Sequence, residues 1–308
     1  MSKPRHRAAA AAFGPGLAAL AALLVTLGGC GGGDPTTPAG SARDGFDGAR
    51  AFADLRAQVA LGPRPSGSPA ARRLSGRLAR ALRRAGVRDV RVQRPLRNVV
   101  GTIGGRGAGA VLVGAHYDTK DGIPGFVGAN DGASGVAVVL ELARSLPNPM
   151  PGPALAIALF DGEEPRGAAP FATDGARGSR QYVEYAARGR GGVPPLAAIE
   201  AMVLFDMVGD CDLAIPREAN SDERLYGHFA AADPAVFAGT TGAIADDHLP
   251  FIAAGVPAVD LIDFDYGPGA EPGEWWHTPA DDLGGVCPES LDAVGAAALR
   301  ALPRIGNG

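Results

Sequence analysis

Five histidine and carboxylate side chains follow apolar, strand-like runs and could together bind a metal ion; they are His116, Asp131, Glu164, Asp206 and His277. The carboxyl ends of parallel strands meet at one edge of an α/β sheet, so side chains placed there converge. Imidazole nitrogens and carboxylate oxygens are ligands that zinc uses in proteins, and a catalytic zinc keeps one position open for water or substrate. The pattern therefore predicts a zinc site.

Two further acids fit such a site. Glu163 directly precedes Glu164, so one carboxylate can bind metal while the other acts as a general acid or base. Asp118 stands two residues after His116, and we expect it to accept a hydrogen bond from the second ring nitrogen of that histidine. Taken singly, each residue has an ordinary structural interpretation, such as a core histidine or a helix cap. Their combination favours a site.

The elements that must position these residues alternate between strands and helices. Apolar runs predict strands at 87–92, 98–103, 111–114, 154–160, 201–205 and 256–262. Helical spacing of apolar residues predicts helices at 46–61, 69–85, 132–146, 178–187, 249–253 and 290–302. This alternation predicts a single α/β domain with a doubly wound, mostly parallel central sheet flanked by helices.

The first 45 residues have the composition of an export signal and a linker. A cationic start precedes an apolar run that ends in Leu-Gly-Gly-Cys, which resembles a bacterial lipobox. We expect residues 1–30 to be a lipoprotein signal peptide with Cys30 lipidated, residues 31–45 a flexible tether, and residues 46–308 the catalytic domain. The protein would then be periplasmic or on the cell surface, anchored to a membrane through Cys30. The alternative is an uncleaved anchor, because the apolar run approaches the ~20 residues that span a bilayer.

The charge balance excludes one class of partner. The chain has 29 basic and 33 acidic residues, and loss of Lys3, Arg5 and Arg7 with the signal peptide leaves 26 against 33. This balance argues against a nucleic-acid partner, because binding a polyanion needs a basic face. The one cationic run, 71–84, has the leucine spacing of an amphipathic helix with a solvated face. Beyond Cys30 only Cys211 and Cys287 remain; export permits a disulfide between them, but the sequence does not place it.

The motifs HYD, GANDGASGVA, FDGEE, DMVG and WWHTPADD resemble the metallopeptidase family that holds bacterial leucyl aminopeptidases and glutaminyl cyclases. The resemblance covers roughly residues 46–302. It implies that Asp131, Glu164 and His277 bind one zinc and that Glu163 is the general acid or base. In the two-zinc aminopeptidases the residue matching Asp131 bridges both ions, and those matching His116 and Asp206 hold the second. The resemblance also implies a cis peptide bond after Asp131.

Three features of the resemblance favour the cyclase branch. The loop 165–177 after GEE is long and has an acid, Asp174, near its end, as in cyclases. The segment 245–257 resembles the cyclase segment in which an acid, here Asp246, hydrogen-bonds to Asp206 near the substrate amine. Trp276 directly precedes His277, where cyclases have an indole in the pocket.

Three features weigh against that branch. The loop 165–177 lacks the tryptophan of cyclases, although Phe171 is available as a substitute. Asp260 stands where some cyclases have a pocket histidine, and GANDGASG matches the peptidases better. We therefore expect a one-zinc glutaminyl-peptide cyclotransferase-like monomer acting on peptide N-termini. The alternatives are an aminopeptidase with one or two zinc ions and, with less support, a non-catalytic binding lipoprotein.

Overall fold

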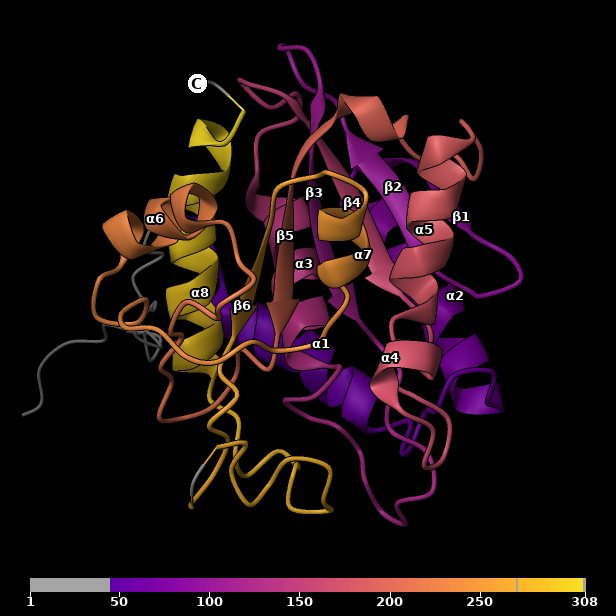
Figure 1. Ribbon diagram of the computed structural model, residues 1–308, viewed down its shortest axis with the longest axis vertical. Helices are drawn as coiled ribbons and strands as arrows, with labels where there is room; N and C mark the ends of the chain where they lie inside the picture. The colour runs from indigo at the N-terminus through magenta and orange to yellow at the C-terminus, as the bar shows by residue number, and fades with distance from the viewer. Residues whose placement is uncertain (1–44, 270, 307–308) are drawn as a thin grey trace, which may run out of the picture. The chain divides into compact units, whose positions relative to one another are not determined.

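A six-stranded sheet lies at the centre of the computed structural model, which describes residues 45–269 and 271–306 (Figure 1). The strands are β1 (Arg88–Val92), β2 (Val99–Ile103), β3 (Ala110–His116), β4 (Ala154–Phe160), β5 (Ile199–Asp206) and β6 (Ala258–Ile262), in the order β1-β2-β4-β3-β5-β6. Strands β4, β3, β5 and β6 are parallel, while β1 and β2 form an antiparallel edge. The predicted α/β fold with a mostly parallel sheet is confirmed.

Helices cover both faces of this sheet. One face carries α1 (Gly48–Val59), α2 (Pro69–Arg84), α3 (Ser134–Ser145) and α8 (Pro288–Ala301), which pack on one another and on the sheet. The other face carries α5 (Arg177–Ala187) and α7 (Leu249–Ala253). The remaining elements are the short α4 (Phe171–Asp174), α6 (Glu223–Ala232) beside α8 and β6, and the 3₁₀ turns Leu196–Ala198 and Leu302–Arg304.

The central strands are apolar without interruption because both of their faces are buried. Along β3, Val111, Val113 and Ala115 pack into the core beneath α3 and α8. The intervening Ala110 and Leu112 pack into the second core beneath α5 and α7. Alternate residues of a strand point to opposite faces, so one apolar run serves two cores. Such a strand belongs in the middle of the sheet, and β3 lies there, between β4 and β5. Strand β2, which precedes β3 in the sequence, pairs with β4 and not with β3.

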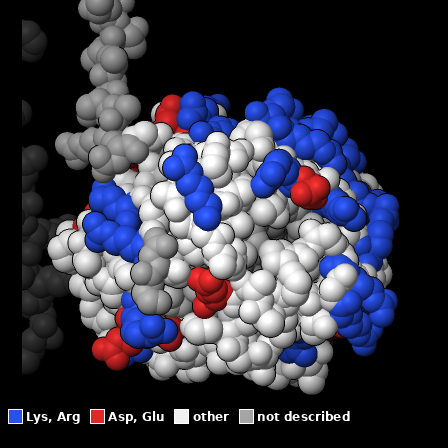
Figure 2. Space-filling model, turned by 90° about the horizontal axis from the view of Figure 1, so that it is seen from above, with Lys and Arg blue, Asp and Glu red and all other residues white. Residues whose placement is uncertain are grey.

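The cationic run in the sequence is helix α2, whose N-terminus is capped by the Ser68 hydroxyl accepting from the Ala71 amide. Its leucines are buried and its arginines are all exposed, as the amphipathic spacing predicts. Among the residues that the structure describes, no ion pair joins an α2 arginine to a carboxylate. Lysine and arginine side chains also dominate one side of the face shown in Figure 2.

A disulfide joins Cys211 and Cys287, a pairing that the sequence left open. It ties the segment after β5 to the start of α8, where the amide of Cys287 also donates to the carbonyl of Gly209 at 3.0 Å. The predicted signal peptide, Cys30 and all but the last residue of the predicted tether lie outside the described residues. Within residues 45–269 and 271–306, no helix combines the length and apolar character needed to cross a bilayer.

Candidate metal centre and catalytic site

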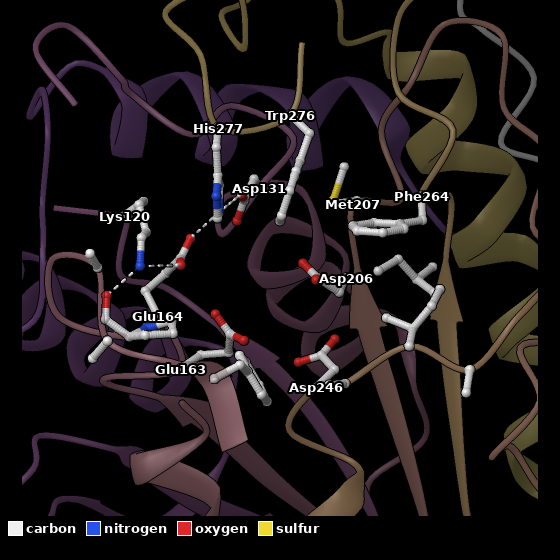
Figure 3. A pocket seen from close by; sticks show the side chains of 18 of the residues that line it. Lys120, Asp131, Glu163, Glu164, Asp206, Met207, Asp246, Phe264, Trp276 and His277 are labelled. Atoms are coloured by element: carbon white, nitrogen blue, oxygen red, sulfur yellow. Dashed lines mark hydrogen bonds and ion pairs between the residues drawn. The ribbon is translucent and has the colours of Figure 1, made fainter. Parts of the chain in front are cut away.

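The five candidate ligands converge at the carboxyl edge of the parallel strands. Four of them, Asp131, Glu164, Asp206 and His277, are labelled in Figure 3. His116 and Asp206 are the last residues of β3 and β5. Asp131 lies between the loop after β3 and helix α3, Glu164 follows β4, and His277 lies in the long loop after β6. Their carboxylates and the His116 ring are buried, whereas His277 remains 22% exposed at the cavity side.

These side chains form two clusters that share Asp131. In the first, Nε2 of His116 lies 3.2 Å from Oδ1 of Asp131 and 3.1 Å from Oδ1 of Asp206. In the second, Nε2 of His277 lies 3.4 Å from Oδ2 of Asp131 and 2.9 Å from Oε1 of Glu164. The ligand atoms of each cluster lie within 4.8 Å of one another. Each carboxylate oxygen of Asp131 thus faces a different histidine, which is the arrangement of a bridging ligand.

The chemistry of both clusters fits zinc, which takes imidazole nitrogen and carboxylate oxygen at about 2.0–2.2 Å. Burial opposes ionisation of Asp131, but hydrogen bonds from His116 and His277 prevail and hold its pKa below the usual range. Burial lowers the pKa of His277, but its hydrogen bonds to Asp131 and Glu164 raise it to about 10. A cation bound by these groups would displace the imidazole protons, since histidine binds metal in its neutral form.

Asp281 holds the backbone that carries the shared ligand, and the sequence did not identify it. Its side chain is fully buried and accepts hydrogen bonds from the amides of Asn130 (2.7 Å) and Asp131 (3.1 Å) and from the hydroxyl of Tyr266. The cis bond implied after Asp131 is wrong, because every cis bond among the described residues precedes a proline. The backbone around Asp131 is instead positioned by the Asp281 carboxylate and by the left-handed φ of 90° at Gly132.

Glu163 lies beside the ligands with its carboxylate turned into the cavity (Figure 3). Burial and the neighbouring Glu164 charge raise its pKa well above the usual range, which suits a group that must both take and return a proton. Asp118 differs from its expected role, because its Oδ1 lies 3.8 Å from Nδ1 of His116, too far for a hydrogen bond. That oxygen instead accepts from the amides of Gly162 and Glu163, so Asp118 fixes the glutamate pair.

Asp206 and Asp246 face each other across a short gap at the cavity wall (Figure 3). No hydrogen bond joins them; Oδ1 of Asp246 accepts from the amide of Asp247, and Oδ2 has no hydrogen-bond partner. The hydrogen bond to Asp206 that the resemblance implied is therefore not formed. Burial and the charges of Asp260 and Asp206 raise the pKa of Asp246 well above the usual range, which favours the protonated form of this carboxyl.

Aromatic side chains shape the cavity, which has a volume of about 470 Å³. The indole of Trp276 stacks on His277 with ring centroids 4.0 Å apart, and Phe264 packs edge-on against Trp276. Phe171, on α4, lines the opposite loop wall. His277 holds its position with a left-handed φ of 53°, a conformation that costs a non-glycine residue about 1–2 kcal/mol. Such local strain is typical of functional sites.

Lys120 is a second residue that sequence reasoning missed. Its ammonium lies 3.9 Å from Oε2 of Glu164 and donates to the carbonyl of Pro165 (Figure 3). It is the only cation lining the cavity among the residues that the structure describes, apart from the imidazole of His277. Its place two residues after HYD is the only sequence signal for it. Lys120 thus lies near Oε2 of Glu164, while Oε1 of the same carboxylate faces His277.

Arg64 is the third missed residue, from a turn that the sequence marks only by its glycines and prolines. It is fully buried, and its guanidinium donates to the carbonyls of Tyr117 (2.9 Å), Val127 and Gly128 (2.8 Å). Its own amide donates to Oγ1 of Thr119 at 2.9 Å. Burial lowers the pKa of Arg64 to about 10, so the group stays charged at neutral pH. One side chain thus fixes both ends of the loop between His116 and Asp131.

Replacing Arg64 with Met is expected to destabilise the fold and weaken zinc binding together. Three buried carbonyls would lose their donor, at about 1–3 kcal/mol each, so we expect a loss of about 3 kcal/mol or more in the free energy of unfolding. Urea denaturation and zinc titration measure the two effects. Arg77→Met, on the exposed face of α2, is the matched control. Unchanged stability and zinc affinity in Arg64→Met would show that the loop is fixed by other contacts.

Comparison with known proteins places this chain among relatives of both predicted kinds. Residues 98–302 match the model of Peptidase family M28. A glutaminyl cyclase from an Acidobacteriales bacterium superposes with a TM-score of 0.75 at 30% identity, covering 89% of this chain and 99% of that chain. A Zn-dependent exopeptidase from Parabacteroides distasonis superposes with a TM-score of 0.69 at 28% identity, covering 85% and 99%.

A curated relative is the glutaminyl-peptide cyclotransferase-like protein of Mus musculus, 29% identical over 229 residues and 63% of this chain. The match spans only 56% of that relative's length. Because the family model matches residues 98–302, more than half of the chain, this chain belongs to peptidase family M28. The resemblance inferred from its motifs is confirmed.

Proposed function

We propose that this protein is a zinc-dependent glutaminyl-peptide cyclotransferase, which converts an N-terminal glutamine to pyroglutamate and releases ammonia. The observation that carries the proposal is the grouping of Glu163, Asp206 and Asp246 around one cavity beside Asp131, Glu164 and His277. Trp276 and Phe264 form an aromatic wall of this cavity, and we expect this wall to limit the site to a side chain of about the size of glutamine. The similarity to the Acidobacteriales glutaminyl cyclase supports the same conclusion.

The reaction requires one proton to move between two nitrogens of the substrate. A zinc held by Asp131, Glu164 and His277 would polarise the γ-carbonyl of the glutamine. We place the substrate α-amine against the Asp206 carboxylate, with the Asp246 carboxyl beside it. Glu163 accepts a proton from the amine as the new N–C bond forms. Glu163 then gives this proton to the γ-nitrogen as the C–N bond breaks, and ammonia leaves.

The second candidate function is aminopeptidase activity, because one observation favours it specifically. His116 and Asp206 form a complete second cluster with Asp131, as a two-metal site requires. In that case Glu163 would take its proton from water, and the peptide bond after the first residue would be hydrolysed. A purely binding role has less support, since the candidate base and all five candidate ligands are present and converge.

The number of zinc ions and the fate of glutamine separate the two functions. We expect the purified protein to cyclise a Gln-initiated peptide, to leave a leucine anilide intact and to contain one zinc by mass spectrometry. His116→Ala is expected to leave the zinc count at one. Asp246→Ala is expected to lower cyclisation at least tenfold with zinc retained, because alanine removes the carboxyl group that faces Asp206 where the substrate amine would lie (Figure 3).

Two results together would contradict the cyclotransferase proposal. Two zinc ions per chain, together with release of bulky apolar N-terminal residues, would make the protein an aminopeptidase. Loss of one of those ions in His116→Ala would confirm which residues hold the second metal.

We also propose that the protein is an exported lipoprotein and a monomer. The support for export is the Leu-Gly-Gly-Cys sequence ending at Cys30, after an apolar run with a cationic start. Cys30→Ala should abolish incorporation of labelled fatty acid and move the protein from the membrane fraction to the soluble fraction. Retention in the membrane would favour an uncleaved anchor. Light scattering of detergent-solubilised protein would measure the oligomeric state.

A further inference from the structure

A second cavity, of about 550 Å³, adjoins the catalytic cavity between α5 and α7. Phe171, Ala245 and Asp246 line both cavities, so the two share a wall. Phe171 is fixed in this wall by Gly175, where even a methyl group would come within 2.5 Å of the phenyl ring. The shared wall lies on the Asp246 side of the site, across the catalytic cavity from Trp276 and His277 (Figure 3).

The lining of the second cavity is mostly apolar. Its other apolar residues are Ala172, Ala176, Val183, Leu249, Pro250 and Ala253. Besides Asp246 in the shared wall, two charged residues contribute, and both are exposed and already engaged. Arg180 donates to the carbonyl of Ala172 at 3.0 Å, and Glu184 pairs with Arg188 at 2.6 Å. A ligand here would gain by burying apolar surface and would find little to bind a charge.

The proposed reaction fixes the direction in which a peptide substrate leaves the site. The glutamine side chain must point to the zinc ligands, and the α-amine must lie by Asp206 and Asp246. The remaining large substituent of the glutamine Cα is the carbonyl that leads to the second residue. Successive Cα atoms are only about 3.8 Å apart, so that residue lies next to whatever borders the amine position. The border at Asp246 and Ala245 is the second cavity.

We propose that this second cavity binds the side chain of the second residue of the substrate peptide and selects a large apolar or aromatic residue there. The inference rests on the proposed cyclotransferase function. The proposal assigns substrate specificity to residues of α5 and α7, two helices that contain none of the candidate ligands or catalytic residues. A hydrophobic cavity of this kind discriminates by about 10-fold to 200-fold between side chains that differ in apolar size.

The test compares kcat/KM for two peptides that differ only at the second residue, Gln-Phe and Gln-Gly, each with the same following sequence. We expect the wild-type protein to prefer the Gln-Phe peptide by at least about tenfold. Ala253→Phe places a ring in the cavity from an exposed position at the end of α7. This variant should reduce the preference towards unity and change kcat/KM for the Gln-Gly peptide by less than about twofold.

Ala187→Phe is the matched control, because Ala187 is an exposed alanine at the end of α5 outside this cavity. It should keep the wild-type preference, and thermal unfolding should confirm that both variants are folded. Cyclisation of both peptides at equal kcat/KM, or a preference that survives Ala253→Phe, would overturn the inference alone. Failure to cyclise any Gln-initiated peptide would overturn the proposed function, and the inference with it.

Discussion

Glu163→Gln is expected to lower kcat by about 10²–10⁴-fold while leaving zinc content at the wild-type level. Glutamine keeps the size and packing of the side chain but cannot take a proton from the substrate amine. The metal should stay because Glu164, and not Glu163, lies 2.9 Å from Nε2 of His277 among the candidate ligands. Turnover of a Gln-initiated peptide and zinc by mass spectrometry are the two measurements.

Glu164→Gln provides the comparison for this experiment. It should lose zinc as well as activity, since a neutral amide is a poor replacement for a carboxylate ligand. A Glu163→Gln variant that keeps full activity, or that loses its zinc, would show that the two glutamates have been assigned the wrong way round.

The second large effect that we expect is in Asp131→Asn, which should lose its bound zinc and, with it, all measurable activity. The Asp131 carboxylate is the only group that both clusters share, and each of its oxygens faces one histidine. The amide is neutral and would turn its N–H₂ group towards one of these imidazoles. Isothermal titration with zinc should show at least a 10³-fold weaker affinity.

The titration also has an expected pH dependence. Because the pKa of His277 is raised to about 10, zinc must displace a proton at neutral pH. Wild-type affinity should therefore rise by about tenfold or more per pH unit between pH 6 and 8. Asp282→Asn, an exposed acid of the WWHTPADD motif, is the control and should bind zinc as the wild type does. Tight zinc binding by Asp131→Asn would remove Asp131 from the centre of the site.

The parts of the site that sequence could predict are those attached to an apolar run. His116 and Asp206 end their strands and Glu164 follows shortly after β4, so the change from apolar to acidic or imidazole residues is visible locally. The parallel sheet then brings them together, because strand ends from distant segments share one edge. The fold class was predictable for the same reason, since strands buried on both faces have continuous apolar sequences.

The parts that could not be predicted depend on partners far away in the chain. Arg64 binds carbonyls 53 to 64 residues later, and Asp281 binds amides 150 residues earlier. Backbone carbonyls and amides leave no mark in a sequence, so neither pairing has a signal. His248 also depends on partners elsewhere in the chain: it is fully buried, 3.3 Å from Glu218 and 3.7 Å from Asp260.

The Cys211–Cys287 bond joins residues separated by 76 positions in the sequence, and the ring that it closes contains Asp246, Trp276 and His277 but neither Glu163 nor Glu164. Closing a loop of that size restricts the unfolded chain by about 4 kcal/mol. The compartment chosen for recombinant production therefore matters to every measurement on this protein. A reducing cytosol would leave both thiols free. Protein made there should unfold at a lower temperature and should bind less than the full amount of zinc, because the loop that carries His277 is less restrained. Material folded in an oxidising periplasm is the preparation on which zinc should be counted.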